Sequence, residues 1–263
     1  MLEYEWINQR NFVPPKGLTR SMAKKQKKFE DFSKSSPKQL SLFQFLEESD
    51  SQALSTGQQK FSQYSQSIEL YDFVPKYVWG KVERINNVFL PPLERDFEYK
   101  GVRRKIVIHP AGIVDKDTKV SKYFYLGRRE EIIEEVLRKL AIEGAGVFLD
   151  GQAGVAFSIY QIRKELELHN HMMSYYQVLE SLKILALTRL ELINPENKKE
   201  TIIFSPIENL GISGEGEETQ TYVIFSPLVT NGIKNLKFRL YNYDQVMKYK
   251  SVIARQLHKR MAH

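Results

Sequence analysis

Two helical patterns separated by a short polar break, at 158–168 and 172–185, most constrain what this chain can fold into. Ser158 and Gln161 have the spacing of a capping box, in which the hydroxyl and the amide satisfy reciprocal backbone groups. Apolar residues then recur at helical spacing in both segments, and His169-Asn170-His171 forms the break. The expected inward residues are Ile159, Ile162 and Leu166, then Tyr175, Val178, Leu179, Leu182 and Leu185. The sequence therefore predicts two helices joined by a tight turn.

An amphipathic helix precedes this pair, and β-favouring runs follow it. Residues 129–143 carry apolar side chains on one helical face, and two glycines end the pattern. Runs typical of strands follow at 189–193, 200–207, 221–226 and 234–241. A helix, a strand, two tightly connected helices and a β-hairpin form the order of a winged helix-turn-helix. We therefore predict an α+β fold built on such a domain.

The rest of the chain divides by composition. The first 66 residues are rich in Ser, Gln, Lys and Pro, which is typical of a disordered tail. A turn is expected at Lys100-Gly101, between two β-favouring runs, and Asp244 is a good N-cap for a last helix. The predicted domains are a disordered basic tail over 1–66 and a DNA-binding domain over 67–263, comprising a β-rich lead-in at 67–127, the winged helix at 128–241 and a basic C-terminal helix at 243–261.

Within the tail, Gln39-Leu40-Ser41-Leu42-Phe43 stands out from its polar surroundings. The pentapeptide resembles the short linear motif by which bacterial proteins dock on the replicative sliding clamp. In an extended peptide the three large apolar side chains can enter a groove while the Gln39 amide hydrogen-bonds at its edge. Burial of each contributes about 1.5–3 kcal/mol, less the cost of ordering the segment. The alternative is a short amphipathic helix that begins here and folds back on the body.

Positive charge is concentrated at the two ends of the chain. Residues 16–38 carry eight basic residues against two acidic ones, and residues 237–263 carry seven against one, a net charge of +6 in each case. Two basic ends on an otherwise acidic chain indicate a polyanionic partner that is contacted at defined places. A solubilising tail and a solvated helix face are the alternative interpretation.

The composition excludes several classes of site. The absence of cysteine rules out a disulfide framework, thiolate zinc sites and cysteine nucleophiles. No apolar run is long enough to span a membrane, and no signal core begins the chain, so the bacterial cytoplasm is the expected location. His169 and His171 have no third ligand nearby in sequence. We expect no catalytic residues, no metal, no cofactor and no enzymatic activity.

In a winged helix-turn-helix, the second helix of the pair enters the major groove with its exposed N-terminal residues. If the apolar face of 172–185 is inward, its polar residues face outward and form the candidate DNA-binding set. Gln can pair with adenine, and Glu can accept from a cytosine amine. The candidate DNA-binding residues are His171, Ser174, Gln177, Glu180 and Lys183, together with Lys248, Arg255 and Lys259 on the last helix. The acidic loop at 213–218 is not expected to lie along a phosphate backbone. An ordinary helical hairpin is the alternative.

This layout is similar to the TrfA-type plasmid replication initiators. In that family an aromatic-rich first helix, paired tyrosines at the start of the recognition helix and a tail motif close to QLSLF recur in the same order. Here the matching segments are 39–43, 156–168 and 174–187. The strand pair at 96–107 also resembles the family's lead-in, and 238–261 resembles its inter-domain helix.

The resemblance implies a plasmid replication initiator that binds double-stranded origin repeats, opens the duplex locally and recruits the host sliding clamp. The replicative helicase and a second copy of the chain are further candidate partners. Members of the family usually have two winged-helix domains, whereas this sequence predicts one. A winged-helix transcriptional regulator of a phage or plasmid is the alternative function. A third hypothesis, a nicking enzyme of the rolling-circle type, would use Tyr176.

Overall fold

The computed structural model describes residues 64–80, 89–115, 118–149, 151–195, 201–214, 220–235 and 238–261. The chain divides into two compact units, Met1–Gln39 and Leu40–His263, and every described residue belongs to the second. The clamp-like motif at 39–43, the predicted disorder of the tail and most of the acidic loop at 213–218 lie outside the described residues.

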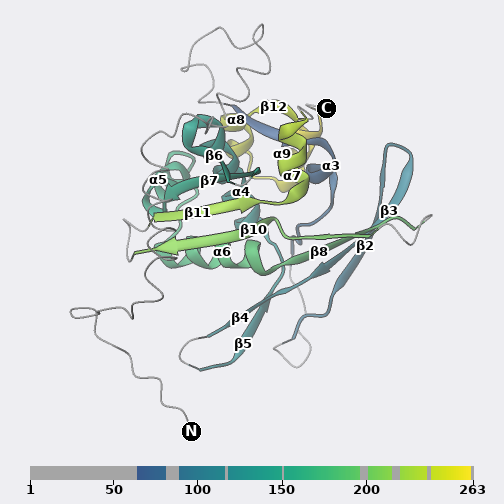
Figure 1. The fold of residues 1–263 in the computed structure, drawn as a ribbon, viewed down its shortest axis with the longest axis horizontal. Helices are drawn as coiled ribbons and strands as arrows, with labels where there is room; N and C mark the ends of the chain where they lie inside the picture. The colour runs from purple at the N-terminus through teal and green to yellow at the C-terminus, as the bar shows by residue number, and fades with distance from the viewer. Residues whose placement is uncertain are drawn as a thin grey trace, which may run out of the picture. The chain divides into compact units, whose positions relative to one another are not determined.

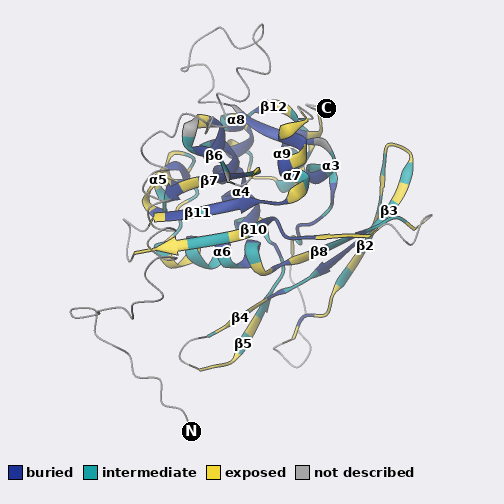
Figure 2. Cartoon of the chain, viewed as in Figure 1, coloured by how far each residue is buried: buried dark blue, intermediate teal, exposed yellow. Residues whose placement is uncertain are grey.

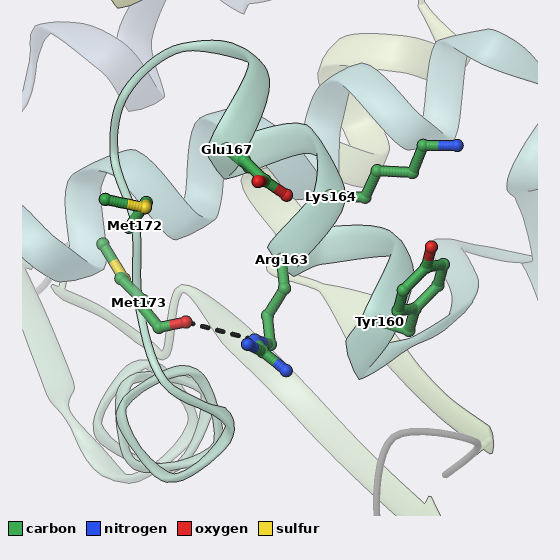
Figure 3. Close-up of a pocket in the computed structure, with 6 residues that line it drawn as sticks. All are labelled: Tyr160, Arg163, Lys164, Glu167, Met172 and Met173. Carbon is green, nitrogen blue, oxygen red and sulfur yellow. Dashed lines mark hydrogen bonds between the residues drawn. The ribbon is translucent and has the colours of Figure 1, made fainter.

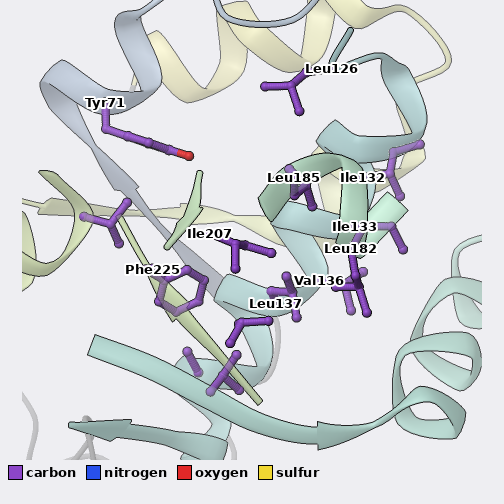
Figure 4. Close-up of a cluster of buried hydrophobic side chains, with 14 of the residues drawn as sticks. Tyr71, Leu126, Ile132, Ile133, Val136, Leu137, Leu182, Leu185, Ile207 and Phe225 are labelled. Atoms are coloured by element: carbon purple, nitrogen blue, oxygen red, sulfur yellow. The ribbon is translucent and has the colours of Figure 1, made fainter. Parts of the chain in front are cut away.

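Helix α4 (Arg128–Leu140) lies at the centre of the described fold and continues into a π-helical turn, η2 (Ala141–Ala145). It contacts α5 (Ile159–Leu168), α6 (Tyr175–Leu187), a strand of the neighbouring sheet and segments from both ends of the described chain. Its apolar side chains Ile133, Val136 and Leu137 are fully buried in the same cluster as Leu182 and Leu185 of α6 (Figure 4). The three predicted helices therefore form, and their apolar faces build one core.

One sheet has the strand order β10-β11-β7-β6, with every pair antiparallel. The hairpin β6 (Gly146–Leu149) and β7 (Gln152–Ser158) leads into α5. The hairpin β10 (Ile207–Ser213) and β11 (Gln220–Phe225) comes after α6, and β11 pairs with β7. A Cβ at Gly211 would lie 1.9 Å from the Tyr222 ring, so the tyrosine can cover this hairpin only where glycine stands.

A second antiparallel sheet has the order β2-β3-β8-β9. Its strands are β2 (Leu93–Tyr99), β3 (Val102–His109), β8 (Arg189–Ile193) and β9 (Thr201–Phe204). Lys100 and Gly101 join β2 to β3 with φ angles of 52° and 76°, the left-handed values of a tight hairpin turn. The predicted turn and the predicted strand at 189–193 are thus confirmed.

Two strand pairs complete the sheets. The short hairpin β4 (Ala111–Val114) and β5 (Ser121–Phe124) follows β3, and β4 contacts α6. Strand β1 (Tyr64–Ile68) pairs with β12 (Phe238–Asn242), which brings the two ends of the described chain together. Helix α3 (Glu69–Phe73) follows β1 directly.

The C-terminal region differs from the prediction in two places. Residues 234–241 are not one strand, because helix α7 (Pro227–Lys234) occupies their beginning. Its N-cap Ser226 accepts a hydrogen bond from the Val229 amide, with proline at the first helical position. The single last helix is two helices, α8 (Tyr243–Lys248), capped by Asn242 rather than Asp244, and α9 (Val252–Met261).

Helix α9 is also oriented opposite to the prediction. Its apolar residues Ile253, Leu257 and Met261 are 75%, 56% and 78% exposed (Figure 2). Arg255 and Lys259, which were expected to face solvent, are buried. The sequence predicted Arg255 and Lys259 as DNA-contacting residues of this helix, whereas the structure buries both and leaves the apolar residues exposed.

Candidate nucleic-acid interface

Helices α5 and α6 are joined by the six residues 169–174, and hydrogen bonds define both ends of this connection. At the C-terminus of α5, the His171 amide donates to the Leu166 carbonyl at 2.9 Å, and the Asn170 amide donates to the Glu167 carbonyl at 3.1 Å. Asn170 has φ 59°, the left-handed conformation that such a helix end requires. The chain therefore stops α5 sharply and turns toward α6.

Capping boxes begin both helices. The predicted box of α5 is confirmed, since Ser158 Oγ accepts from the Gln161 amide at 3.2 Å and Gln161 Oε1 accepts from the Ser158 amide at 2.7 Å. At α6, Ser174 Oγ accepts from the Gln177 amide at 3.3 Å, and Gln177 Oε1 accepts from the Ser174 amide at 2.8 Å. Ser174 and Gln177 are exposed as predicted, but their side chains hold the start of α6.

The first turn of α6 and the residues before it present apolar side chains outward. Met172 is 82% exposed and Tyr176 is 78% exposed, while Tyr175 is half-buried and its ring lies edge-on to that of Tyr176. Val178, two residues after Tyr176, is fully buried, so Tyr176 lies on the opposite, outward side of the first turn. Exposed large apolar side chains mark a surface for interaction when they gather near polar ones.

A shallow pocket of about 230 Å³ lies between α5 and the residues that lead into α6 (Figure 3). Arg163 lines this pocket, and its Nε donates to the Met173 carbonyl at 3.2 Å. Lys164 is exposed, and Glu167 gives the rim one negative charge. The residues that line the pocket are Tyr160, Arg163, Lys164, Glu167, Met172 and Met173. Sequence reasoning did not include these residues, although two adjacent basic residues on α5 were a visible signal.

Two of the remaining predicted residues of α6 and of the turn, His171 and Glu180, interact with other parts of the fold. His171 is half-buried, and its Nε2 lies 2.9 Å from the Met247 carbonyl. Burial lowers the pKa of His171 below its usual value, which favours the neutral ring. Glu180 accepts from Arg129 Nη2 at 2.6 Å. This ion pair partly neutralises a carboxylate that would otherwise repel DNA phosphates. Lys183 is partly exposed.

The predicted residues of the last helices divide sharply. Lys248 is exposed on α8, as a phosphate contact requires. Arg255 and Lys259 are 1% and 3% exposed, so the prediction that they contact DNA is wrong. Arg255 Nη2 lies 2.9 Å from Glu131 Oε2, and Lys259 Nζ lies 2.5 Å from Glu135 Oε1. Both partners lie on α4. The sequence did not predict that this acidic face of α4 is covered by another helix.

A second buried charge cluster lies on α4 one turn further along. Arg138 is fully buried between Asp72 and Glu134, at 2.7 and 2.8 Å. Lys76 lies 3.8 Å from Glu134 and 3.5 Å above the Tyr71 ring centroid. Burial lowers the pKa of Lys76 to about 8, against the opposing effect of Glu134 and Asp72. This cluster joins α3 to α4, and it is structural rather than part of the surface described above.

The described residues contain no group of His, Cys, Asp and Glu arranged to hold a metal ion. None of the described helices is both long and apolar enough to cross a membrane.

Comparisons with known proteins found partial similarity in fold. No family model matches the chain, and no curated protein matches it in sequence. A crystal structure of RctB domains 2-3 (RctB-155-483) is similar at 11% identity and a TM-score of 0.45, covering 65% of each chain. Selenomethionine derivatives of domains 2 and 3 of RctB give 10% identity and a TM-score of 0.43, covering 65% of this chain and 62% of that one. The chain thus matches less than two thirds of the length of either structure.

Proposed function

We propose that the protein binds double-stranded DNA through a winged helix-turn-helix made of α4, α5, α6 and the β10–β11 hairpin. The observation that carries the proposal is the strand order β10-β11-β7, in which the strand before α5 pairs with the second strand of the hairpin after α6. This pairing supports a winged helix, in which α6 would be the recognition helix. In this arrangement α5 crosses the DNA backbone, and the start of α6 enters the major groove.

Three lysines on α5, α6 and α8 could contact a phosphate backbone. Lys164 on α5, Lys183 on α6 and Lys248 on α8 are at least partly exposed, and none has an ion pair among the described residues. Each phosphate neutralised by a lysine releases condensed counterions, so binding weakens as salt rises. These three lysines replace Arg255 and Lys259 as the proposed phosphate contacts. Ser174 and Gln177 remain candidates for additional contacts at the same edge.

We further propose that the protein is a replication initiator, with origin repeats as its DNA and the sliding clamp as its protein partner. The support is the motif Gln39–Phe43 and its order relative to the helical pair, which resembles the TrfA-type plasmid initiators. The proposed role is one of binding and recruitment, without an enzymatic step. A transcriptional regulator would use the same DNA-binding body without the motif.

Two measurements on the full chain test these proposals. In duplex binding as a function of salt, Lys164→Ala should weaken binding to all sequences and reduce the slope of log K against log salt by about 1. Lys234→Ala, on the exposed end of α7, is the matched control. A wild-type chain that binds duplex DNA without salt dependence would contradict the proposed interface.

The second measurement is binding to the purified bacterial sliding clamp. Leu42→Ala/Phe43→Ala should abolish clamp binding, whereas Phe29→Ala/Phe32→Ala in the same tail should leave it intact. Equal clamp binding by the wild-type chain and the Leu42→Ala/Phe43→Ala variant, or no clamp binding by either, would remove the main support for the replication initiator.

A further inference from the structure

The start of α6 offers little of the hydrogen-bonding chemistry by which proteins usually read bases. A glutamine recognises adenine by using its oxygen and its nitrogen together. Gln177 Oε1 already accepts from the Ser174 amide at 2.8 Å, and Ser174 Oγ accepts from the Gln177 amide. A bidentate pair between Gln177 and adenine would therefore require the capping box to open, at the expense of helix stability.

The same edge offers apolar surface instead. Met172 and Tyr176 are 82% and 78% exposed, one just before α6 and the other in its first turn. The Tyr176 ring is supported edge-on by Tyr175, which fixes part of its orientation. In the major groove, only thymine presents a methyl group, and apolar side chains are the groups that contact it.

We infer that Met172 and Tyr176 are specificity-determining residues that contact the 5-methyl groups of thymines in the major groove. The inference rests on the proposed duplex binding by α6 and adds the chemistry of its sequence preference. Arg163 and Lys164 of α5 line the adjacent pocket, and in the proposed binding mode α5 is the helix that crosses the phosphate backbone. The preferred duplex then carries T·A pairs opposite the start of α6.

Replacement of thymidine by deoxyuridine tests this directly, because deoxyuridine lacks only the methyl group and keeps the same hydrogen-bonding edge. The full chain is first used to select its preferred duplex from a random library at fixed salt. Wild-type protein should then bind the deoxyuridine form of that duplex about four-fold more weakly for each thymine in contact, the value for one buried methyl group.

Substitutions in the protein show which side chains cause the preference for thymidine over deoxyuridine. Met172→Ala/Tyr176→Ala should bind the thymidine and deoxyuridine duplexes equally, whereas Tyr176→Phe should retain the preference because it keeps the ring. Ile253→Ala/Leu257→Ala removes two other exposed apolar side chains, from α9, and should leave duplex binding unchanged. Equal binding of the two duplexes by wild type, or an undiminished preference in the first double variant, overturns the inference while duplex binding stands. Failure to bind any duplex overturns the proposed function as well.

Discussion

Helices α6 and α9 are both amphipathic, and they bury opposite faces. In α6 the apolar residues Val178, Leu182 and Leu185 are fully buried. In α9 the apolar Ile253 and Leu257 are exposed. Two of its basic residues, Arg255 and Lys259, are instead buried against α4. The two helices therefore contact the same central helix through different chemistry.

The difference originates in α4, which has two faces of its own. Its apolar side, which includes Ile133 and Val136, belongs to the core cluster that contains the buried residues of α6. Its other side carries Glu131 and Glu135, and a neighbour there must bring cations, because a buried carboxylate without a partner is strongly destabilising. Periodicity in sequence identifies an amphipathic helix, but the surface it meets decides which face is covered.

The largest expected effect comes from removing one cation of α9. Arg255→Ala removes the cationic partner of buried Glu131, which keeps only the Gln256 amide as a donor, and should lower the free energy of unfolding by about 3–5 kcal/mol. Lys248→Ala, an exposed lysine of α8, should change it by less than about 0.5 kcal/mol. Chemical denaturation of both variants measures the difference. Glu131→Ala/Arg255→Ala should lose less than the two single changes together, and strict additivity would refute the pairing.

The next largest effect on stability is expected from leucine-to-alanine substitutions in α6 and α9. Leu182→Ala in α6 should cost about 2–5 kcal/mol through lost burial and a cavity, because the side chain is 0% exposed. Leu257→Ala in α9 should cost less than about 0.5 kcal/mol, since its side chain is already 56% exposed. Thermal or denaturant unfolding of both variants measures the two losses in the free energy of unfolding. Equal losses at both positions would mean that α9 buries its apolar face.

Acid should lower the stability that the ion pairs of Asp72 and Glu134 give to the fold. Burial alone would raise the pKa of Asp72 and Glu134, but Arg138 and Lys76 outweigh it and lower both pKa values. Carboxyls with a lowered folded-state pKa stabilise the fold above their unfolded pKa of about 4 and lose that contribution as pH falls further. Unfolding followed between pH 6 and pH 2 should therefore show stability falling below about pH 4. Asp72→Asn should flatten this dependence, and an unchanged slope in that variant would exclude Asp72 as its source.

The smallest effect concerns the start of α6. Ser174→Ala removes the cap that accepts from the Gln177 amide and should cost about 1 kcal/mol. Ser158→Ala at the start of α5 is the matched comparison, with a similar expected loss. Duplex binding by Ser174→Ala should weaken more than duplex binding by Ser158→Ala, since α6 is the helix proposed to enter the groove. Equal losses of duplex binding in the two variants would contradict the assignment of α6 as the helix that enters the groove.

Local chemistry predicted much of this fold. The Ser158 capping box, the Lys100-Gly101 turn and the inward face of α6 depend on neighbours in sequence, and all three are found. The tripeptide Phe-Ser-Pro, which occurs at 204–206 and at 225–227, shows the limit of prediction from local sequence. Ser205-Pro206 leads into strand β10, whereas Ser226-Pro227 begins helix α7. The same local signal permits both outcomes, and contacts from elsewhere in the chain select one.

The candidate site was predictable in its location but not in its chemistry. The start of α6 was identified, and its polar residues were assigned to base contact. Ser174 and Gln177 instead satisfy each other, which a capping box also predicts. The burial of Arg255 depends on Glu131, a residue 124 positions earlier, and no local pattern gives that pairing.

Photocrosslinking of duplex DNA to the two helices tests the central claim, that the start of α6 is the DNA-binding surface. A benzophenone side chain is placed at position 176 in one variant and at position 257 in another, both of which are exposed apolar positions. The account predicts that position 176 crosslinks to a bound duplex and position 257 does not. Crosslinking at position 257 without crosslinking at position 176 would contradict it.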